Sequence, residues 1–279
     1  MNALELRSAD GTKLKAYRWE PEGTSKADVV LVHGGMEHLG RYTYVGEYLA
    51  GRGYRVIGVD LRGHGHSEGK RGHVDRWNQY VEDVRAAIAT LEGNYFMVCH
   101  SMGGLITLDH LRTASSVRGV IASAPLLGLA IQAPAVKTMA AKLLSKLVPA
   151  LSMHNELDGA LVCTDQEVVD RYNADPLVFS TITPRWYTEM LAALERVHRF
   201  AEKFRTPLYL CYGTEDAIVD TDAIEIFSKQ YGGPVEIKAW PGLFHEIFNE
   251  PNKEEVLETA CDWLDALANP ASTGDERDE

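Results

Sequence analysis

Cysteine is scarce in this sequence, and no two cysteines lie close together along the chain. The four are Cys99, Cys163, Cys211 and Cys261. None belongs to a C-x-x-C pair of the kind that zinc and redox sites use, and four are too few for a disulfide framework in a chain of 279 residues. We therefore expect four reduced thiols and no metal site.

Net positive charge and long apolar runs are also lacking. The formal net charge is -12, which repels phosphate backbones, and no local basic patch offsets it, so we expect no nucleic-acid partner. No window reaches the roughly 18 apolar residues of a membrane span. The first residues, "MNALELRSADG", do not combine a basic stretch with an apolar run as a signal peptide does. These absences predict a cytoplasmic protein.

Short apolar runs rich in β-branched residues do recur, each ending in Gly, Asp, Ser or Pro. They are "DVVLVHG", "YRVIGVD", "YFMVCHS", "VRGVIASAP", "PLYLCYG" and "VEIKAWPG". Helical patterns fall between them at about 42–51, 77–91, 102–113, 221–231 and 252–267. This alternation predicts a mostly parallel sheet that helices cover on both faces, with ligands bound at the carboxyl ends of the strands. Only the start, "ALELRSADGTKLKAYRWEP", has period two and predicts a β-hairpin.

One long interval interrupts the alternation. No convincing strand is found between Pro125 and Pro207, and a structureless loop of that length is unusual in a compact domain. We expect a helical cap at 126–183, inserted into a core formed by 1–125 and 184–268. A helix over 184–204 should lead back to the sheet. The polar, acidic end at 269–279 is expected to be disordered.

Ser101 lies in "YFMVCHSMGGL", directly after an apolar strand and before a helix. This is the setting of a nucleophile elbow, G-x-S-x-G, in which the turn is so tight that the neighbours of the serine must be small. Gly103 and Gly104 meet that need, whereas Cys99 stands where the first glycine is usual. The alternative is a serine N-cap on an ordinary helix.

A catalytic serine needs a base and a group that orients the base, and after an elbow the chain order is acid, then histidine. We predict His245 as the base, because "VEIKAWPGLFHEIF" places it in the loop after the last strand. Asp216 follows the strand of "PLYLCYGTEDAIVD" and is the favoured acid, with Glu215 and Asp220 as alternatives. His100 is expected to point away from the serine, because side chains alternate along a strand.

The oxyanion of an acyl-transfer intermediate needs preorganised N–H donors. One is expected from Met102, the residue after the serine. The other is expected from Gly35 in "HGGMEH", the loop after the "VVLVHG" strand, where glycine lets the backbone approach a substrate closely. The alternative is that Gly34 and Gly35 form a turn and nothing more.

Together these motifs resemble the α/β-hydrolases, and more closely the monoacylglycerol lipase and lysophospholipase group, also described as serine aminopeptidase-like. The matching segments are "LVHGGMEHLGRY" (31–42), "GYRVIGVDLRGHGHSEGKRGHV" (53–74), "CHSMGGL" (99–105), "YNADPLVF" (172–179), "YGTEDAIVD" (212–220) and "PGLFHEIFNEP" (241–251). The resemblance implies an α/β-hydrolase fold: a mostly parallel, eight-stranded sheet flanked by helices, with a helical cap inserted after the sixth strand.

The resemblance also assigns residues. It implies Ser101, Asp216 and His245 as the catalytic triad. It implies Gly35 and Met102 as the oxyanion hole. The D-x-R-G-x-G-x-S turn at 60–67 is interpreted as a structural brace, with its histidines bonded in the loop rather than paired on a metal.

The expected cap contains "APAVKTMAAKLLSKLVPAL" (133–151), with apolar residues at helical spacing and lysines on the other side. The resemblance implies a cap that lines an acyl tunnel, so the expected substrate-binding residues are Leu143, Leu147, Leu177, Val178 and Ile218. Such a cap could also touch a membrane or lipid surface. Alternatively, the apolar stripe packs on the body below it.

The triad pattern and the family resemblance together predict a serine esterase that cleaves single-chain lipid esters, above all monoacylglycerols, with no metal or organic cofactor. The nearest alternatives are the same machinery acting on lysophospholipids, short acyl esters or peptides. An alternative from another class is a catalytically silent hydrolase fold that serves as a binding module. Dehalogenase and epoxide hydrolase chemistry is disfavoured because the elbow carries Ser and not Asp. The protein is expected in the cytoplasm or peripherally at lipid surfaces, and its oligomeric state is left open.

Overall fold

The computed structural model describes residues 1–131, 134–155 and 157–268. The expected disordered tail at 269–279 lies outside the described residues.

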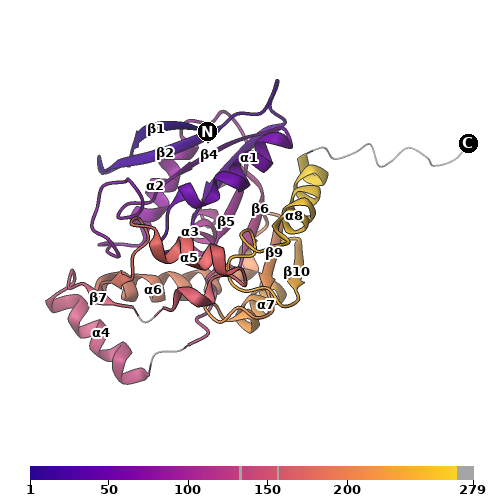
Figure 1. Ribbon diagram of the computed structural model, residues 1–279. Coiled ribbons are helices and arrows are strands. Elements are labelled where there is room, and N and C mark those ends of the chain that lie inside the picture. Colours follow the sequence, from indigo (N-terminus) through magenta and orange to yellow (C-terminus); the bar gives the residue numbers. More distant parts are fainter. Residues whose placement is uncertain (132–133, 156, 269–279) are drawn as a thin grey trace, which may run out of the picture.

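An eight-stranded sheet forms the centre of the protein, in the order β1-β2-β4-β3-β5-β6-β9-β10 (Figure 1). Its strands are β1 (Asn2–Arg7), β2 (Lys13–Trp19), β3 (Ala27–Val32), β4 (Tyr54–Val59), β5 (Tyr95–His100), β6 (Val117–Ser123), β9 (Leu208–Gly213) and β10 (Val235–Trp240). The first two form the expected antiparallel hairpin, and β2 also pairs antiparallel with β4. From β4 through β3, β5, β6 and β9 to β10, each pair of neighbouring strands is parallel. The predicted fold class is therefore confirmed.

Side chains of the central strands enter two separate cores. In β3, Val30 and Val32 belong to one core, and Val29 and Leu31 belong to the other. The first core is closed by α2 (Asn78–Ile88), α3 (Met102–Leu111), α6 (Pro184–Phe200) and α7 (Thr221–Gln230), and the second by α1 (Thr43–Gly51) and α8 (Lys253–Ala268). Burial of both faces explains the continuous apolar runs in the sequence. The run in β10 is different: four of its six residues are exposed, because β10 is the edge strand.

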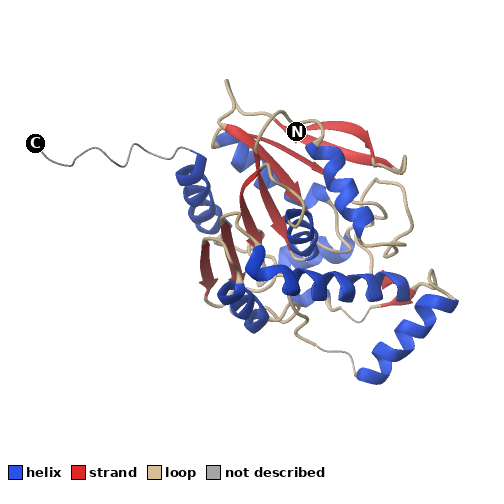
Figure 2. Ribbon diagram, turned by 180° about the vertical axis from the view of Figure 1, so that it is seen from behind, coloured by secondary structure: helices blue, strands red, loops and turns tan. Residues whose placement is uncertain are grey.

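The interval between β6 and β9 leaves the sheet. It contains α4 (Ala135–Leu147), β7 (Met153–His154), η2 (Gly159–Leu161), α5 (Gln166–Ala174) and β8 (Thr181–Ile182), and α6 with η3 (Ala201–Lys203) returns to the sheet. We propose that residues 126–183 form the cap. The pairing of β7 with β8 was not expected, since strands of two residues show no periodicity. Figures 1 and 2 show α4 standing off at one side, beside α6.

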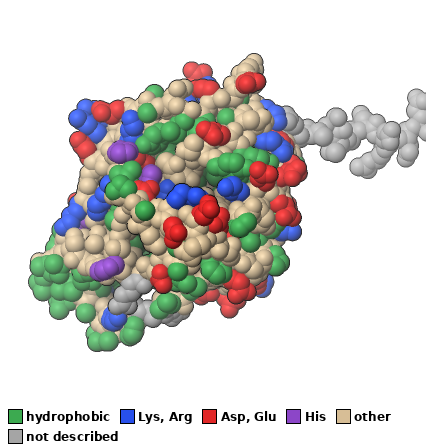
Figure 3. All heavy atoms as spheres, in the orientation of Figure 1, with side chains coloured by type: hydrophobic (Ala, Val, Ile, Leu, Met, Phe, Trp, Pro, Cys, Tyr) green, Lys and Arg blue, Asp and Glu red, His purple; other side chains and the backbone are tan. Residues whose placement is uncertain are grey.

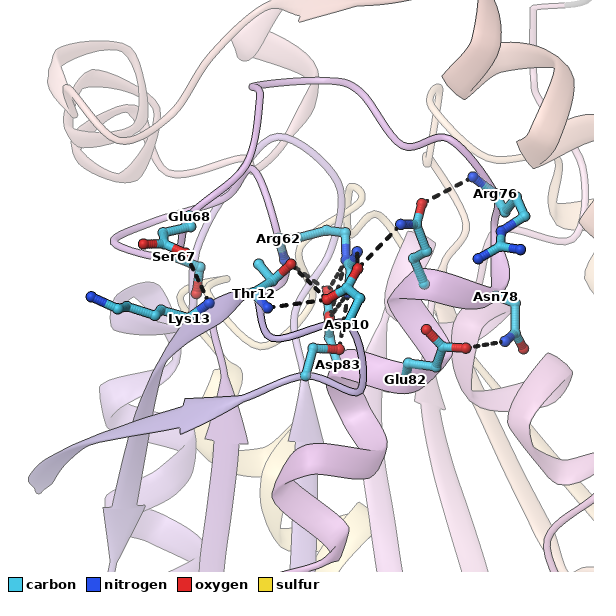
Figure 4. Close-up of polar contacts among 12 residues, drawn as sticks. Asp10, Thr12, Lys13, Arg62, Ser67, Glu68, Arg76, Asn78, Glu82 and Asp83 are labelled. Atoms are coloured by element: carbon cyan, nitrogen blue, oxygen red, sulfur yellow. Dashed lines mark hydrogen bonds and ion pairs between the residues drawn. The ribbon is translucent and has the colours of Figure 1, made fainter.

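The turn at 60–67 joins the turn of the amino-terminal hairpin to α2. The Arg62 guanidinium donates to the buried Asp83 of α2 and to Asp10 of the hairpin turn, each at 2.6 Å (Figure 4). The Asp60 carboxylate accepts from the backbone N–H groups of Leu39 and His66. These contacts join segments far apart in the sequence and support the interpretation of the turn as a structural brace.

Candidate active site

Ser101 lies on a strained turn between β5 and α3. Its φ and ψ are 50° and -118°, a conformation that non-glycine residues rarely adopt and that is typical of functional sites. A side chain at Gly103 would meet the Val32 carbonyl oxygen at 2.5 Å, and one at Gly104 would meet the Pro125 side chain at 2.6 Å. The Ser101 side chain makes no capping hydrogen bond to α3. The geometry is therefore that of an elbow and not that of an ordinary N-cap.

His245 and Asp216 are in direct contact, although they come from different loops. His245 Nδ1 lies 2.7 Å from Asp216 Oδ2, and both side chains are buried. Asp216 Oδ1 accepts hydrogen bonds from the N–H groups of Ile218 and Val219. Burial alone would raise the pKa of Asp216, but His245 and these donors outweigh it and hold the pKa below its ordinary value. The carboxylate stays ionised and fixes Nδ1 of the imidazole as the donor.

The two alternative acids lie elsewhere. Glu215 is exposed. Asp220 caps α7 by accepting from the Ala223 N–H. Neither carboxylate contacts His245, so the geometry favours Asp216.

Gly35 and Met102, the residues expected to supply the oxyanion hole, lie next to each other. A Cβ atom placed on Gly35 would be 3.6 Å from Met102 Cβ, and both residues line the same cavity as Ser101. The Gly34 N–H donates to Glu37 Oε1 at 2.7 Å, which holds the loop beside the elbow. We propose that the N–H groups of Gly35 and Met102 bind the oxyanion.

His100 also lines this cavity, which corrects the expectation that it points away. Its ring centre is 4.6 Å from that of His245. Alternation fails here because Ser101 has left the extended conformation, so its side chain and that of His100 no longer take opposite faces. Burial lowers the pKa of His100 to about 3. The ring is therefore neutral beside His245.

A buried group of three charges was not expected from the sequence. The Arg41 guanidinium donates to Glu37 at 2.6 Å and to both carboxylate oxygens of Glu246 at 2.6 Å. Burial opposes the charge of Arg41, but the two carboxylates raise its pKa well above the ordinary value. Because Glu37 holds the Gly34 loop and Glu246 follows His245, Arg41 connects the two sides of the site. The only signal in the sequence is the charge next to the predicted catalytic positions, in "HGGMEHLGRY" and "FHEIF".

Ser101 and His245 open onto a cavity of about 350 Å³. Most of its wall is apolar and comes from the cap, from α6 and from the loop after Asp216. These residues include Leu129, Leu157, Leu161, Val162, Trp186, Met190 and Ile218. Such a cavity suits an apolar ligand held against a polar reactive group.

The five predicted substrate-binding residues take different places. Ile218 lines the main cavity, and Val178 lines a smaller one of about 170 Å³ beside it. Leu177 is partly exposed and lines neither cavity. Leu143 and Leu147 are 59% and 68% exposed, and lie outside both cavities. The expectation that these two leucines line the acyl site is corrected: α4 turns Ala141 and Ser145 toward the protein and its leucines outward.

The histidines of the brace turn make local contacts. His64 is buried, and its Nδ1 lies 2.9 Å from the Arg62 carbonyl oxygen. In the part of the chain that the structure describes, no three His, Cys, Asp or Glu side chains are grouped so that they could hold a metal ion.

The family of the chain follows from its sequence together with this geometry. Residues 23–252 match the serine aminopeptidase S33 family. The chain belongs to this family. A monoacylglycerol lipase from Mycolicibacterium smegmatis is 32% identical over 262 residues, which are 91% of this chain and 93% of that protein. Phospholipase YtpA from Bacillus subtilis is 32% identical over 254 residues, which are 87% of this chain and 98% of that protein.

The chain also resembles a longer protein and a solved structure. An uncharacterized abhydrolase domain-containing protein from Dictyostelium discoideum is 32% identical over 93% of this chain, which spans only 28% of that longer protein. The crystal structure of a monoacylglycerol lipase from Paleococcus ferrophilus matches with a TM-score of 0.86 at 32% identity, covering 91% of this chain and 99% of that one. The predicted membership of the α/β-hydrolases is confirmed.

Proposed function

We propose that this protein is a serine esterase that hydrolyses monoacylglycerols to a fatty acid and glycerol. The observation that carries the proposal is the meeting of three features: a serine on a strained elbow, a buried histidine–aspartate pair, and an apolar cavity onto which the serine and the histidine both open. The relatives named as monoacylglycerol lipases in the family support the choice of substrate.

The mechanism follows from the roles that the geometry allows. His245 removes the proton of Ser101 as the hydroxyl attacks the ester carbonyl, and Asp216 holds the tautomer and stabilises the imidazolium. The N–H groups of Gly35 and Met102 stabilise the oxyanion, each worth about 3 kcal/mol in the transition state. His245 then protonates the departing glycerol oxygen. Water, activated by the same histidine, cleaves the acyl-enzyme and restores the serine.

The apolar wall of the cavity supports a single acyl chain as the substrate's apolar part. Apolar side chains make up most of this wall, and the polar side chains that line it include Ser101, His100 and His245. A lysophospholipid presents the same kind of chain, and the relative named as a phospholipase keeps that substrate as an alternative. Short acyl esters are the other alternative with the same catalytic residues.

Ser101→Ala tests the proposal. The variant should fold normally and lose turnover of monoacylglycerol and labelling by a fluorophosphonate probe, because the attacking oxygen is gone. Ser228→Ala, which removes an exposed hydroxyl on α7, is the matched control and should keep both. Esterase activity that persists in pure Ser101→Ala would end the proposal. A panel of monoacylglycerols, lysophosphatidylcholine, short esters and a proline amide then ranks the substrates, and absence of labelling in the unaltered protein would indicate a silent binding module.

We also propose that α4 contacts a lipid surface during the reaction. Its outward residues Val136, Met139, Leu143 and Leu147 are each at least 59% exposed. Hydrophobic side chains gather on this end of the molecule (Figure 3). Lys137, Lys142 and Lys146 add positive charge to an otherwise acidic protein. The contact proposed is a peripheral one, made by the exposed face of an amphipathic helix. Among the helices of the described residues, none has the length and hydrophobicity of a membrane span.

A further inference from the structure

Glu250 is a fully buried carboxylate in the loop that carries the catalytic histidine. It forms no ion pair among the described residues. Its charge is instead met by N–H and O–H donors: the Phe244 N–H at 2.9 Å, the Thr164 N–H at 3.1 Å and the Thr164 hydroxyl. A buried ionised carboxylate is costly unless such donors surround it. The position of this carboxylate therefore depends on both partners staying in place.

The two partners belong to different parts of the fold. Phe244 immediately precedes His245, whereas Thr164 lies in the cap between η2 and α5. Glu250 thus holds the backbone next to the catalytic histidine and a cap residue with one side chain.

Two more hydrogen bonds join the same segments. The Glu246 N–H donates to the Val162 carbonyl oxygen at 2.7 Å. The Cys163 thiol donates to the Asn249 carbonyl oxygen at 3.5 Å. Each of the three cap residues 162–164 is therefore bonded to the loop 244–250, which we call the histidine loop.

The bonded cap segment is also part of the substrate cavity. Leu161 and Val162 line the cavity. Val162 also packs in a small core with Val168 and Val169, and Ile218 from the loop after Asp216 packs against this core. A ligand in the cavity would therefore contact the segment that Glu250 holds. Displacement of that segment would shift the backbone beside His245.

We propose that Glu250 is a positioning residue that ties His245 to the inner cap segment, so that the histidine is placed for catalysis only while this segment is seated. This inference rests on the proposed esterase function. Glu250 does not touch the reacting atoms. It acts by fixing the histidine loop against the wall of the acyl cavity, and small misplacements of a catalytic group can cost about 100-fold in rate.

Glu250→Gln is the direct test. The amide keeps the size of the side chain but turns one acceptor into a donor that faces the N–H of Phe244 or Thr164. With a soluble short-chain ester we expect kcat, and the rate of fluorophosphonate labelling of Ser101, to fall about tenfold or more with little change in KM. Asp83→Asn is the matched control, because it alters an equally buried carboxylate, which lies on α2, contacts Arg62 of the brace turn and does not line the cavity. It should lower the melting temperature and leave kcat within about twofold.

A second pair of variants decides the case if Glu250→Gln does not fold. Thr164→Val removes the hydroxyl donor and should lower kcat and the labelling rate severalfold, whereas Thr164→Ser keeps the donor and should restore both. Full kcat in folded Glu250→Gln, or equal activity of the two Thr164 variants, would overturn the inference. Neither result would touch the proposed function, which Ser101→Ala and the labelling of the unaltered protein test separately.

Discussion

The carboxyl ends of the strands and the outer part of the cap, formed by α4, differ in what they bury and what they expose. At the strand ends polar and charged groups are buried, and each has a partner: Asp216 with His245, and Glu37 and Glu246 with Arg41. On α4 the apolar side chains are exposed, and the helix is held to α6 through small or polar residues such as Ser145 and Thr188. Buried charge requires fixed geometry, whereas exposed apolar surface requires an apolar ligand. We infer that the strand ends set the rate on any ester and that the outer cap governs access to lipid.

The cap also has two parts that differ in how they are held to the rest of the protein. Its inner segment at 162–164 is bonded to the histidine loop, residue by residue. Its outer helix contacts the body through one face only, where Ala141 and Ser145 are buried. We propose that this division lets α4 contact a lipid surface while Ser101, Asp216 and His245 stay in place.

The largest effect is expected from Arg41→Met. Removing the guanidinium leaves the carboxylates of Glu37 and Glu246 buried without a counter-charge, and breaking a buried ion pair in this way costs about 3–5 kcal/mol of stability. Because Arg41 also joins the Gly34 loop to the histidine loop, kcat on a soluble ester should fall roughly 100-fold. Urea unfolding and kinetics on 4-nitrophenyl butyrate measure the two effects.

Arg199→Met is the control for that variant. Arg199 pairs with Glu195 on the surface, where both side chains are at least 70% exposed, and exposed pairs of this kind contribute little. Stability and kcat should both stay close to those of the unaltered protein. If Arg41→Met changes the free energy of unfolding and kcat as little as Arg199→Met does, the buried ion pairs at the strand ends do not contribute more than exposed ones. That result would contradict the role inferred for the strand ends.

A smaller and more selective effect is expected from Leu143→Ser combined with Leu147→Ser. Both leucines are exposed, so their loss should leave folding and the hydrolysis of soluble esters unchanged. Burying one leucine side chain is worth about 1.5–3 kcal/mol. Partial burial of two in a lipid surface then corresponds to a loss of about tenfold in activity on monoacylglycerol in vesicles.

Ile226→Ser separates a specific cap effect from a general loss of surface hydrophobicity. Ile226 is 52% exposed on α7, outside the cap, and its substitution should not change activity on vesicles. An equal loss in both variants, or a loss on soluble esters in the double variant, would contradict a lipid-contacting role for the outer cap.

The residues that could be predicted from the sequence are those whose role depends on the chain near them. Ser101, Asp216 and His245 each follow an apolar strand, and parallel strands bring their carboxyl ends to one edge, so their meeting follows from local patterns. The strands and helices of the core were predicted for the same reason. Only β10 differs in burial, because its place at the edge is a property of the sheet order and not of its own residues.

The remaining features depend on which loops meet in space. Arg41 lies 205 residues from Glu246 in the chain, and nothing near either residue indicates the pair. His100 joins the site only because the backbone at Ser101 departs from the strand. Leu143 and Leu147 show the converse: helical spacing identified their common face correctly, but it does not say whether that face meets the protein or the surroundings.

The smallest effect is expected from Cys99→Gly, which restores the usual residue of the elbow. The Cys99 side chain lies in the first core with residues of α3 and not in the substrate cavity, and its thiol donates to the Ile121 carbonyl oxygen at 3.4 Å. Burial raises the pKa of this thiol to about 12, so it stays protonated and takes no part in the chemistry.

In Cys99→Gly the close approach of strand and helix is retained, because Gly103 and Gly104 provide it. Loss of the buried side chain and the added freedom of glycine should cost about 1–2 kcal/mol in urea unfolding. The value of kcat on both soluble and lipid esters should change by less than about threefold, which corresponds to less than about 0.7 kcal/mol in the barrier. A tenfold gain in kcat would instead show that cysteine at this position distorts the elbow, and would place the limit on rate at the strand end rather than at the cap.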